Sequence, residues 1–317
     1  MNSTWDCIVV GGGAAGLSAG LVLGRARRRT LVVDGEGQSN RVADGIGGLL
    51  GHDTRPPVDF YAAGRAELAA HPSVELRFGE VVSGERNDDF TLEFADGSTE
   101  RARRVLLATG MDYRYPSLPG VEERWGRSVF HCPFCHGWEH RDESLGVLDR
   151  GESGVHRALL LRGWSDDVTL LTDGDPSLEP DDVDRLHAAG VAVDERPVAG
   201  LRGPGANLTA VAFADGGERP CGGLLVPVTL HQRSALAAQL GAATAEPGPL
   251  AADAVAVDDA FATTVPGLFA AGDAGGVMPS VANAVASGNT AAAMLVGSLL
   301  TTPAGLAASA ADSSAAR

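Results

Sequence analysis

Cys132 and Cys135 form a Cys-x-x-Cys pair, with His131 directly before it and His136 directly after it. Such a pair can cycle between dithiol and disulfide, because one thiolate exchanges with a substrate and the second resolves the mixed disulfide. Histidine titrates near neutral pH, so a neighbouring imidazole can take the proton of an incoming thiol. His131 and His136 are both candidates, and His140, one helical turn further on, is a third. The pattern predicts thiol–disulfide chemistry and leaves the choice of histidine open.

Zinc binding is the alternative for a cysteine pair of this spacing. A structural zinc site needs two more ligands at suitable spacing, such as a second Cys-x-x-Cys. The other two cysteines, Cys7 and Cys221, stand alone, and the three histidines near the pair are too close in sequence to complete an obvious tetrahedral set. We therefore predict a redox pair and no metal. Cys7 is expected to be a small core residue, and neither lone cysteine is assigned a role.

A glycine-rich turn near the start of the chain predicts a dinucleotide site. Gly11, Gly13 and Gly16 follow an apolar run, with Ala15 inside the motif, and Asp34 comes roughly 20 residues after the glycines. In a βαβ unit these glycines let the backbone approach a pyrophosphate, and the acid accepts a ribose hydroxyl. The elements expected here are a strand over 5–10, a helix over 14–28 and a strand over 30–34.

The remainder of the chain predicts a second βαβ unit placed inside the first. After a Tyr/Pro/Arg-rich crossing at 111–119, a new strand, turn, helix and strand follow, and the chain then returns with a strand that ends in Gly272-Asp273. The fold class is α/β with two Rossmann-like domains, a split domain over 1–113 and 239–317 and an inserted domain over 114–238. The Ala/Ser-rich tail, 302–317, is expected to be disordered. The further elements expected are helices over 58–70, 155–163 and 280–300 and strands over 74–78, 81–85, 91–94, 103–107, 144–148 and 167–172.

The second dinucleotide turn looks damaged. In the segment 149–154, Asp149 stands where the first glycine should make the tight turn. A carboxylate there would repel phosphates, and its Cβ would obstruct the turn. The next strand ends in Thr172-Asp173, with no basic residue to hold a 2′-phosphate. We expect the inserted domain to keep the nucleotide fold as a scaffold without binding NADPH, with retained NADH binding as the alternative.

Composition narrows the class of protein. The 317 residues suffice for two domains, and no apolar run reaches the roughly 18 residues that span a bilayer. All 25 basic residues are arginine, so chemistry that depends on a lysine is excluded. The net charge of −16 argues against binding to nucleic acid or to an anionic membrane. The N-terminus shows no secretory signal, so a cytoplasmic location is expected, which suits a catalytic Cys-x-x-Cys.

With these parts in order, the chain resembles the low-molecular-weight thioredoxin reductase superfamily from residue 6 to about residue 300. The shared features are the first glycine turn, Ala108-Thr109-Gly110, the prolines of 116–120, the cysteine pair and Gly272-Asp273. The resemblance implies FAD held by the first and last segments, with Asp273 near the ribityl chain and the start of the last helix near the isoalloxazine. The predicted cofactor-binding residues are Gly11, Gly13, Ala15, Gly16, Asp34, Asn40, Arg41, His52, Val82, Ala108, Thr109, Gly110, Gly272, Asp273, Val281 and Ala282.

Two departures separate the chain from true thioredoxin reductases. Those enzymes usually carry an aspartate after the second cysteine and an intact NADPH turn, whereas His136 follows the pair here and the turn is altered. The longer motif 132–139, with 39–41 and 51–53, is similar to that of the FAD-dependent dithiol oxidases that close the disulfides of gliotoxin, holomycin and romidepsin. The lysine-free, Ala/Gly/Arg-rich composition suggests a GC-rich bacterial genome. Among the substrates that the resemblance implies, a bacterial dithiolopyrrolone of the holomycin type is therefore expected first.

The resemblance implies a reaction cycle. A thiolate of a small-molecule dithiol attacks Cys132, and Cys135 leaves as a thiolate beside the flavin. The second substrate thiol then releases the intramolecular disulfide, Cys135 passes the electron pair to FAD through C4a, and O2 reoxidises the flavin to give H2O2. A homodimer is expected from the superfamily, and the two domains are expected to keep a fixed arrangement. The alternatives are a thioredoxin reductase fed by NAD(P)H or ferredoxin, and a redox-sensing module with a vestigial flavin site.

Overall fold

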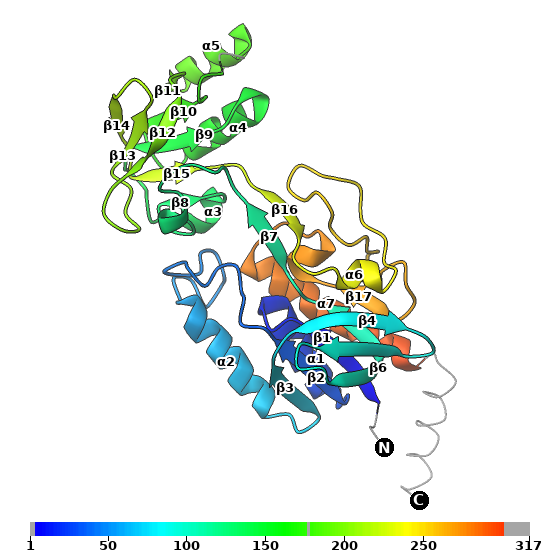
Figure 1. Cartoon of the computed structure of the whole chain (residues 1–317). Coiled ribbons are helices and arrows are strands. Elements are labelled where there is room, and N and C mark those ends of the chain that lie inside the picture. Colours follow the sequence, from blue (N-terminus) through cyan, green and yellow to red (C-terminus); the bar gives the residue numbers. More distant parts are fainter. Residues whose placement is uncertain (1–3, 176–177, 301–317) are drawn as a thin grey trace, which may run out of the picture. The chain divides into compact units, whose positions relative to one another are not determined.

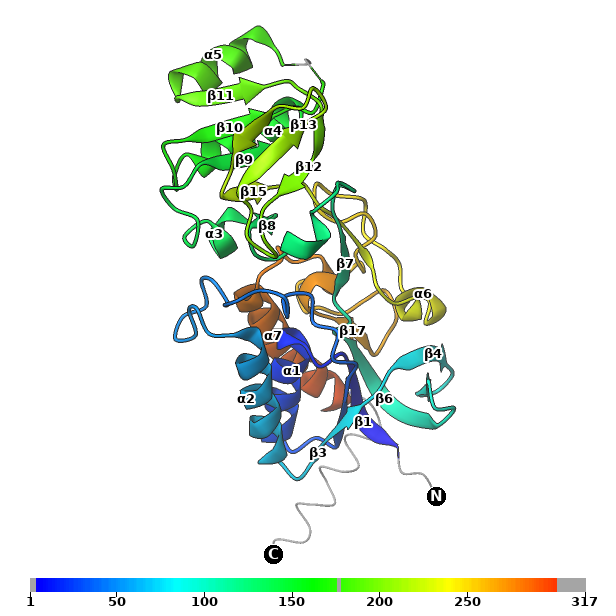
Figure 2. The same ribbon diagram turned by 60° about the vertical axis from the view of Figure 1, so that its left-hand side comes forward.

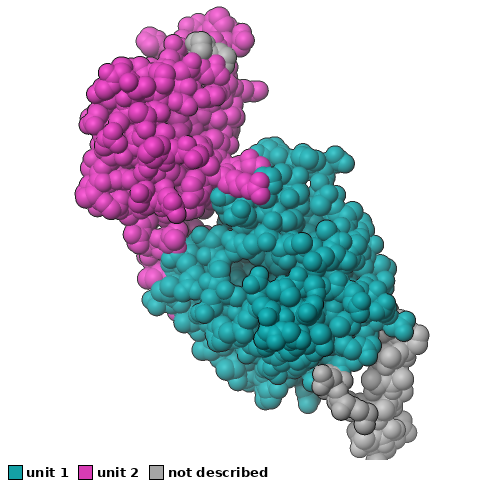
Figure 3. All heavy atoms as spheres, in the orientation of Figure 1, with its two compact units in different colours: residues 1–41, 57–113, 230–317 teal, residues 42–56, 114–229 magenta. Residues whose placement is uncertain are grey.

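The computed structural model describes residues 4–175 and 178–300, so the tail expected to be disordered lies outside the described residues (Figure 1). The chain forms two compact units, unit 1 over 1–41, 57–113 and 230–317 and unit 2 over 42–56 and 114–229 (Figure 3). Unit 2 takes up the chain at residue 114, where the inserted domain was expected to begin. Among the described residues, no helix is long and apolar enough to cross a membrane.

Two segments lie in a different unit from the one expected. Residues 230–238 belong to unit 1 rather than to the insertion, because Leu236 is buried in the core of unit 1. Residues 42–56 belong to unit 2 rather than to the split domain. Gly47 in this segment packs against the backbone of Cys135, which explains the assignment. We call residues 42–56 the strap.

Unit 1 is built on a seven-stranded sheet in the order β3-β2-β1-β6-β5-β4, with β17 paired to β6. β1 pairs in parallel with both β2 and β6, as a dinucleotide-binding core requires. The elements of this unit are β1 (Trp5–Val10), α1 (Ala14–Arg25), β2 (Thr30–Asp34), α2 (Pro57–Ala69), β3 (Val74–Phe78), β4 (Val81–Arg86), β5 (Phe90–Phe94), β6 (Thr99–Leu107), α6 (Leu236–Gln239), β17 (Leu268–Ala270), η2 (Gly272–Gly275) and α7 (Val281–Leu300).

Both faces of this sheet are covered, which explains why β1 is apolar throughout. Ile8 and Val10 pack into a cluster with β5 and α6 on one face, and Cys7 and Val9 pack with α1, α2 and α7 on the other. Figures 1 and 2 show these three helices together on one side of the sheet. Cys7 is fully buried, which raises the pKa of its thiol far above the usual range and suits the predicted core role.

Unit 2 contains a parallel five-stranded sheet in the order β11-β10-β9-β15-β8 and a three-stranded sheet, β12-β13-β14. The chain passes between the units along two paired strands, β7 (Met111–Arg114) and β16 (Thr229–Gln232). The elements of unit 2 are η1 (Glu122–Arg124), β8 (Val129–Phe130), α3 (Pro133–His136), β9 (Leu145–Leu148), α4 (Gly151–Leu161), β10 (Val168–Leu171), α5 (Pro180–Ala188), β11 (Val191–Asp194), β12 (Val198–Arg202), β13 (Ala210–Phe213), β14 (Glu218–Pro220) and β15 (Gly223–Leu225).

The predicted fold class, two Rossmann-like α/β domains with the second inserted, is confirmed. The helix expected over 14–28 ends at Arg25, because Arg27 adopts a positive φ of 57° that a helix cannot contain. The helix expected from 155 begins at Gly151. The prediction began too late because the residues of the first turn are polar or glycine, so the apolar periodicity starts only after them.

Candidate functional site

The first glycine turn forms a cradle of bare backbone between β1 and α1. Gly11 has a φ of 119°, and a Cβ there would collide with the carbonyl of Ala108. A Cβ at Gly16 would collide with the carbonyl of Gly11, so α1 packs against the end of β1 only because residue 16 is glycine. Gly13 lies at the N-cap of α1, whose first turn carries no acidic side chain. This is the geometry that binds a pyrophosphate at a helix N-terminus.

Asp34 ends β2 beside this cradle and is almost completely buried. Its Oδ1 accepts hydrogen bonds from the backbone N–H of Glu36 at 2.8 Å and from Nε2 of Gln38 at 3.0 Å. Its Oδ2 accepts one from Nη1 of Arg65 at 3.0 Å. A carboxylate offers about four acceptor positions, so one remains for a ribose hydroxyl. The sequence predicted Asp34 but missed Gln38 and Arg65.

A second acidic side chain, Asp273, follows β17. Burial raises the pKa of its carboxyl group above the usual range, and its Oδ2 accepts a hydrogen bond from the hydroxyl of Tyr113 at 2.8 Å. Gly272 has a φ of 69° and donates its N–H to Oγ of Ser287 at 2.9 Å. These contacts fix the Gly-Asp turn against α7, and Tyr113 had not been predicted.

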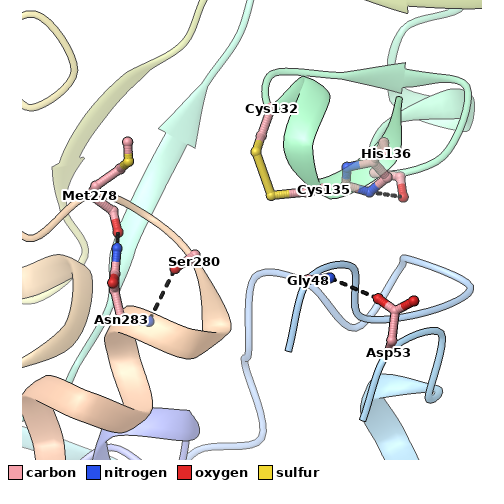
Figure 4. Close-up of a disulfide and its surroundings, with 9 residues drawn as sticks. Gly48, Asp53, Cys132, Cys135, His136, Met278, Ser280 and Asn283 are labelled. Carbon is pink, nitrogen blue, oxygen red and sulfur yellow. Dashed lines mark hydrogen bonds between the residues drawn. A yellow bond between two sulfur atoms is a disulfide. The ribbon is translucent and has the colours of Figure 1, made fainter. Parts of the chain in front are cut away.

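The last helix crosses α1 closely and presents its N-terminus beside the Gly-Asp turn. A Cβ at Gly288 would collide with the carbonyl of Ala15, which explains why both helices carry small residues at this crossing. Oγ of Ser280 accepts the N–H of Asn283 at 3.0 Å and caps α7 (Figure 4). Val281 and Ala282 therefore form the first turn of α7 in the structure.

The other predicted cofactor residues divide between the two units. Ala108, Thr109 and Gly110 follow β6 at the cradle, Val82 is exposed on β4, and Asn40 accepts the hydroxyl of Tyr61 at 2.8 Å. Arg41 Nη1 donates to the carbonyl of Glu36 at 2.7 Å, within unit 1. His52 belongs to unit 2, where its Nδ1 lies 3.1 Å from Nη1 of Arg55. The structure thus groups all of these residues in unit 1 except His52.

In unit 2, Cys132 and Cys135 form a disulfide with their Cα atoms 5.3 Å apart (Figure 4). Cys132 is the N-cap of the short helix α3 and Pro133 its first residue, a position that suits the fixed φ of proline. The aromatic side chains near the pair are open to solvent: Phe134 is 67% exposed and Trp138 is 63% exposed. The predicted redox pair is therefore geometrically able to form its bond. Among the described residues, no group of three or more potential ligands could hold a metal.

Within unit 2, the strap packs against the backbone of the disulfide-forming Cys135. A Cβ at Gly47 would collide with the carbonyl oxygen of Cys135 and lie 3.2 Å from its Cα. Arg127 holds the first residues of the strap, donating from Nε to the carbonyl of Val42 at 3.0 Å and pairing with Asp44 at 3.2 Å. The sequence predicts this segment in the split domain, with His52 as a cofactor-binding residue, and does not reveal its packing on the redox motif.

The three candidate histidines have different surroundings. Burial lowers the pKa of His131 to about 4, and its ring stacks on Trp125 at 5.7 Å. Burial also lowers the pKa of His136, whose Nε2 donates to the carbonyl of Gly126 at 3.1 Å. Figure 4 shows the His136 ring pointing away from the two sulfur atoms. Both histidines are therefore neutral bases at neutral pH, and the disulfide form does not bring His136 to the sulfurs.

His140 is held more tightly than a solvated surface residue. Its Nδ1 lies 3.0 Å from Oε2 of Glu143, and its Nε2 lies 3.3 Å from the carbonyl oxygen of Arg127. Its ring stacks on Phe130, as does the ring of His136, with centroids 5.6 and 5.7 Å apart. Both ring nitrogens of His140 thus lie near hydrogen-bond acceptors, and these contacts fix the orientation of the ring.

The second dinucleotide turn, between β9 and α4, is filled by its own side chains. Asp149 accepts the backbone N–H of Arg150 at 2.8 Å and Oγ of Ser153 at 2.9 Å, and it forms an ion pair with Arg157. Arg150 in turn pairs with Asp173 at 3.0 Å. Arg157 had not been anticipated, and it neutralises the carboxylate. The Asp149 carboxylate, with its hydrogen-bonding and ion-pair partners, therefore fills the turn. We expect this filling, more than repulsion by a net negative charge, to hinder phosphate binding there.

A cradle for a dinucleotide in one unit and a redox disulfide in the other define a thiol–disulfide oxidoreductase that uses a bound dinucleotide. The chain belongs to the family described as pyridine nucleotide-disulphide oxidoreductase, whose model matches residues 5–288. Proteins of this family and its thioredoxin-reductase-like members are flavoproteins, and FAD is the cofactor. The glycine cradle, the acceptor left on Asp34 and the buried carboxylate of Asp273 fit that group.

Individual relatives place the chain within that family. It is 34% identical to thioredoxin reductase tcpT of Claviceps purpurea over 93% of this chain and 94% of that protein. It is 30% identical to thioredoxin reductase sirT of Leptosphaeria maculans over 91% and 92%. Among solved structures, HlmI is 35% identical with a TM-score of 0.88, covering 99% of this chain and 98% of that one. An oxidoreductase from Agrobacterium tumefaciens is 34% identical with a TM-score of 0.88, covering 94% and 99%.

Proposed function

We propose that the protein oxidises a small-molecule dithiol to its intramolecular disulfide, with O2 as the final electron acceptor and H2O2 as the second product. The observation that carries this proposal is the second dinucleotide turn. Asp149 and Arg157 form an ion pair at the turn where a βαβ unit ordinarily binds the pyrophosphate of a nicotinamide cofactor, which supports the absence of a nicotinamide donor. A domain that does not bind a nicotinamide supplies no hydride, so we take the thiol substrate as the source of the electrons.

In the proposed cycle, a substrate thiolate attacks Sγ of Cys132, the disulfide breaks, and Cys135 leaves as a thiolate. The second substrate thiolate then attacks the substrate sulfur of the mixed disulfide and displaces Cys132. The substrate has lost two electrons and two protons, and the cysteine pair has gained the two electrons. Bound FAD supplies the two-electron acceptor that reoxidises the pair and that O2 then reoxidises, so that dithiol plus O2 gives disulfide plus H2O2.

The exposed surroundings of the pair support a substrate with an apolar body. Phe134 lies between the two cysteines, and Trp138 follows on the same segment, both largely exposed. A dithiol on a small planar ring, such as a dithiolopyrrolone precursor, matches this chemistry. Neutral His131 or His136 would accept the thiol proton, and His136 would need to turn toward the sulfurs after the disulfide opens. We also propose that the enzyme is cytoplasmic and a homodimer.

The test is anaerobic stopped-flow of the flavin-loaded protein against NADPH, NADH and a small dithiol, followed by admission of oxygen. We expect the dithiol to bleach the visible flavin band, the nicotinamides to leave it unchanged, and oxygen to restore it with stoichiometric H2O2. Rapid bleaching by NADPH or NADH together with turnover of a thioredoxin would instead establish a thioredoxin reductase, the activity named for the fungal relatives.

A further inference from the structure

Asp273 and Tyr113 form a buried polar pair in unit 1 that links the flavin site to the strand leaving the unit. The hydroxyl of Tyr113 donates to Oδ2 of Asp273 at 2.8 Å. Within residues 4–175 and 178–300, no side chain or backbone group donates a hydrogen bond to the other oxygen, Oδ1. One oxygen of the carboxylate is thus oriented by the protein, and the other is available to a ligand.

Three ionisable groups from different elements face Asp273. Burial raises the pKa of Asp273, and the Tyr113 hydrogen bond and the charge of Arg233 lower it again. Arg233 follows β16 and is fixed by hydrogen bonds to the carbonyls of Gly37 and Met111, the second at 3.2 Å. Tyr61 on α2 is the third group: burial raises its pKa to about 12, and the charge of Asp273 adds to the increase. Of the two groups that favour the ionised carboxylate, Tyr113 lies on β7 and Arg233 directly follows β16.

We propose that Tyr113 is a positioning residue of the flavin site, whose hydrogen bond to Oδ2 orients the Asp273 carboxylate so that Oδ1 accepts a hydroxyl of the cofactor. Burial and the charge of Asp273 raise the pKa of Tyr113 far above its usual range, so the phenol stays protonated and can donate to the carboxylate. Arg233 supports the same carboxylate through its charge. The proposal concerns the binding of FAD and does not depend on the identity of the thiol substrate.

Removing the phenol hydroxyl leaves Oδ2 buried without its donor and favours protonation of Asp273. A protonated Asp273 is a poorer acceptor, so FAD affinity should decrease as the pH falls. In the wild type that decrease begins at a lower pH, because Tyr113 and Arg233 keep the carboxylate ionised. In Tyr113→Phe we expect affinity about 10-fold weaker at pH 7, the scale of one hydrogen bond to a charged group, and a decrease that begins at higher pH.

The experiment titrates apoprotein with FAD by flavin fluorescence at several pH values between 5.5 and 8.5. Tyr61→Phe is the matched control, because it removes a buried tyrosine hydroxyl that bonds Asn40 and does not donate to Asp273. Arg233→Gln should shift the pH dependence in the same direction as Tyr113→Phe. A Tyr113→Phe protein with the affinity and pH dependence of the wild type would overturn the proposal.

A general loss of fold is excluded by the urea midpoint of each apoprotein. If Tyr113→Phe does not fold, Arg233→Gln carries the test alone, and an unchanged pH profile in that variant counts against the proposal. Equal weakening at every pH in Tyr113→Phe and Tyr61→Phe would show a structural effect and would also overturn it.

Discussion

Asp149, just before α4, forms an ion pair with Arg157 in the second turn of that helix, and Ser153 in the first turn donates to the same carboxylate. The pair lies where a βαβ unit binds the pyrophosphate of a dinucleotide. The close packing that this fold requires is nevertheless kept. A Cβ at Gly154 would lie 3.0 Å from the carbonyl carbon of Asp149, which parallels the relation of Gly16 to Gly11 in the first unit. The fold of a nucleotide domain is thus retained while its phosphate position is filled.

The first prediction is that Asp149→Gly creates nucleotide binding. The substitution removes the carboxylate and frees the Arg157 guanidinium for a charge-assisted contact with a pyrophosphate. We expect at least about 10-fold tighter binding of NADH than in the wild type, measured by quenching of NADH fluorescence. NADPH should bind less well, since Asp173 is near the 2′-phosphate position. Asp166→Gly is the control, because that fully exposed carboxylate also pairs with an arginine; equal gains in both variants would contradict the prediction.

The second prediction separates the roles of the two cysteines. Cys135→Ser should abolish reduction of the flavin by a dithiol, because the remaining thiol cannot pass on the electron pair. Cys132→Ser should abolish turnover but can retain a long-wavelength thiolate–flavin charge-transfer band. The measurement is anaerobic stopped-flow with absorbance detection, and Cys221→Ser is the matched control, since burial raises the pKa of that thiol to about 12. Fast bleaching that survives Cys135→Ser would refute the thiol route.

The third prediction concerns stability and pH. The pKa of His131 is lowered from 6.5 to about 4 by burial, so the unfolded chain binds the proton more readily than the folded one. Its contribution to stability is therefore fully present above about pH 6.5 and is lost as the pH falls toward 4, by an amount on the order of 3 kcal/mol. His131→Phe keeps a ring against Trp125 and should flatten this part of the urea-midpoint profile. His187→Gln, at an exposed position on α5, should not.

Local patterns in the sequence were sufficient to predict the sheet cores and the two motifs. β1 begins and ends where predicted because a strand covered on both faces is a continuous apolar run. The end of α1 was missed because a non-glycine residue, Arg27, takes the left-handed conformation there. The contact of Arg157 with Asp149 could have been predicted, because Ser153 and Arg157 follow Asp149 at intervals of one helical turn.

Two of the missed site residues, Arg65 and Tyr113, depend on contacts between distant segments. Arg65 reaches Asp34 from α2, and Tyr113 reaches Asp273 from β7, pairs separated by 31 and 160 positions. No short-range pattern encodes such a contact, because it arises only when the sheet brings strand ends together. The same reason applies to the strap. Its polar, glycine-rich sequence is typical of a loop, and only the structure shows that Gly47 packs against Cys135.

The fourth prediction tests that last contact. Gly47→Ala would place a methyl group against the carbonyl of Cys135, so either the strap or α3 has to move. We expect a loss of stability of about 1–3 kcal/mol, as for overpacking elsewhere, and slower reduction of the flavin by a dithiol, because the cysteine backbone is displaced. Urea unfolding and anaerobic stopped-flow measure the two effects. Gly248→Ala is the control, since a Cβ there meets nothing within 4 Å. If Gly47→Ala matches that control in both measurements, the strap does not position the disulfide.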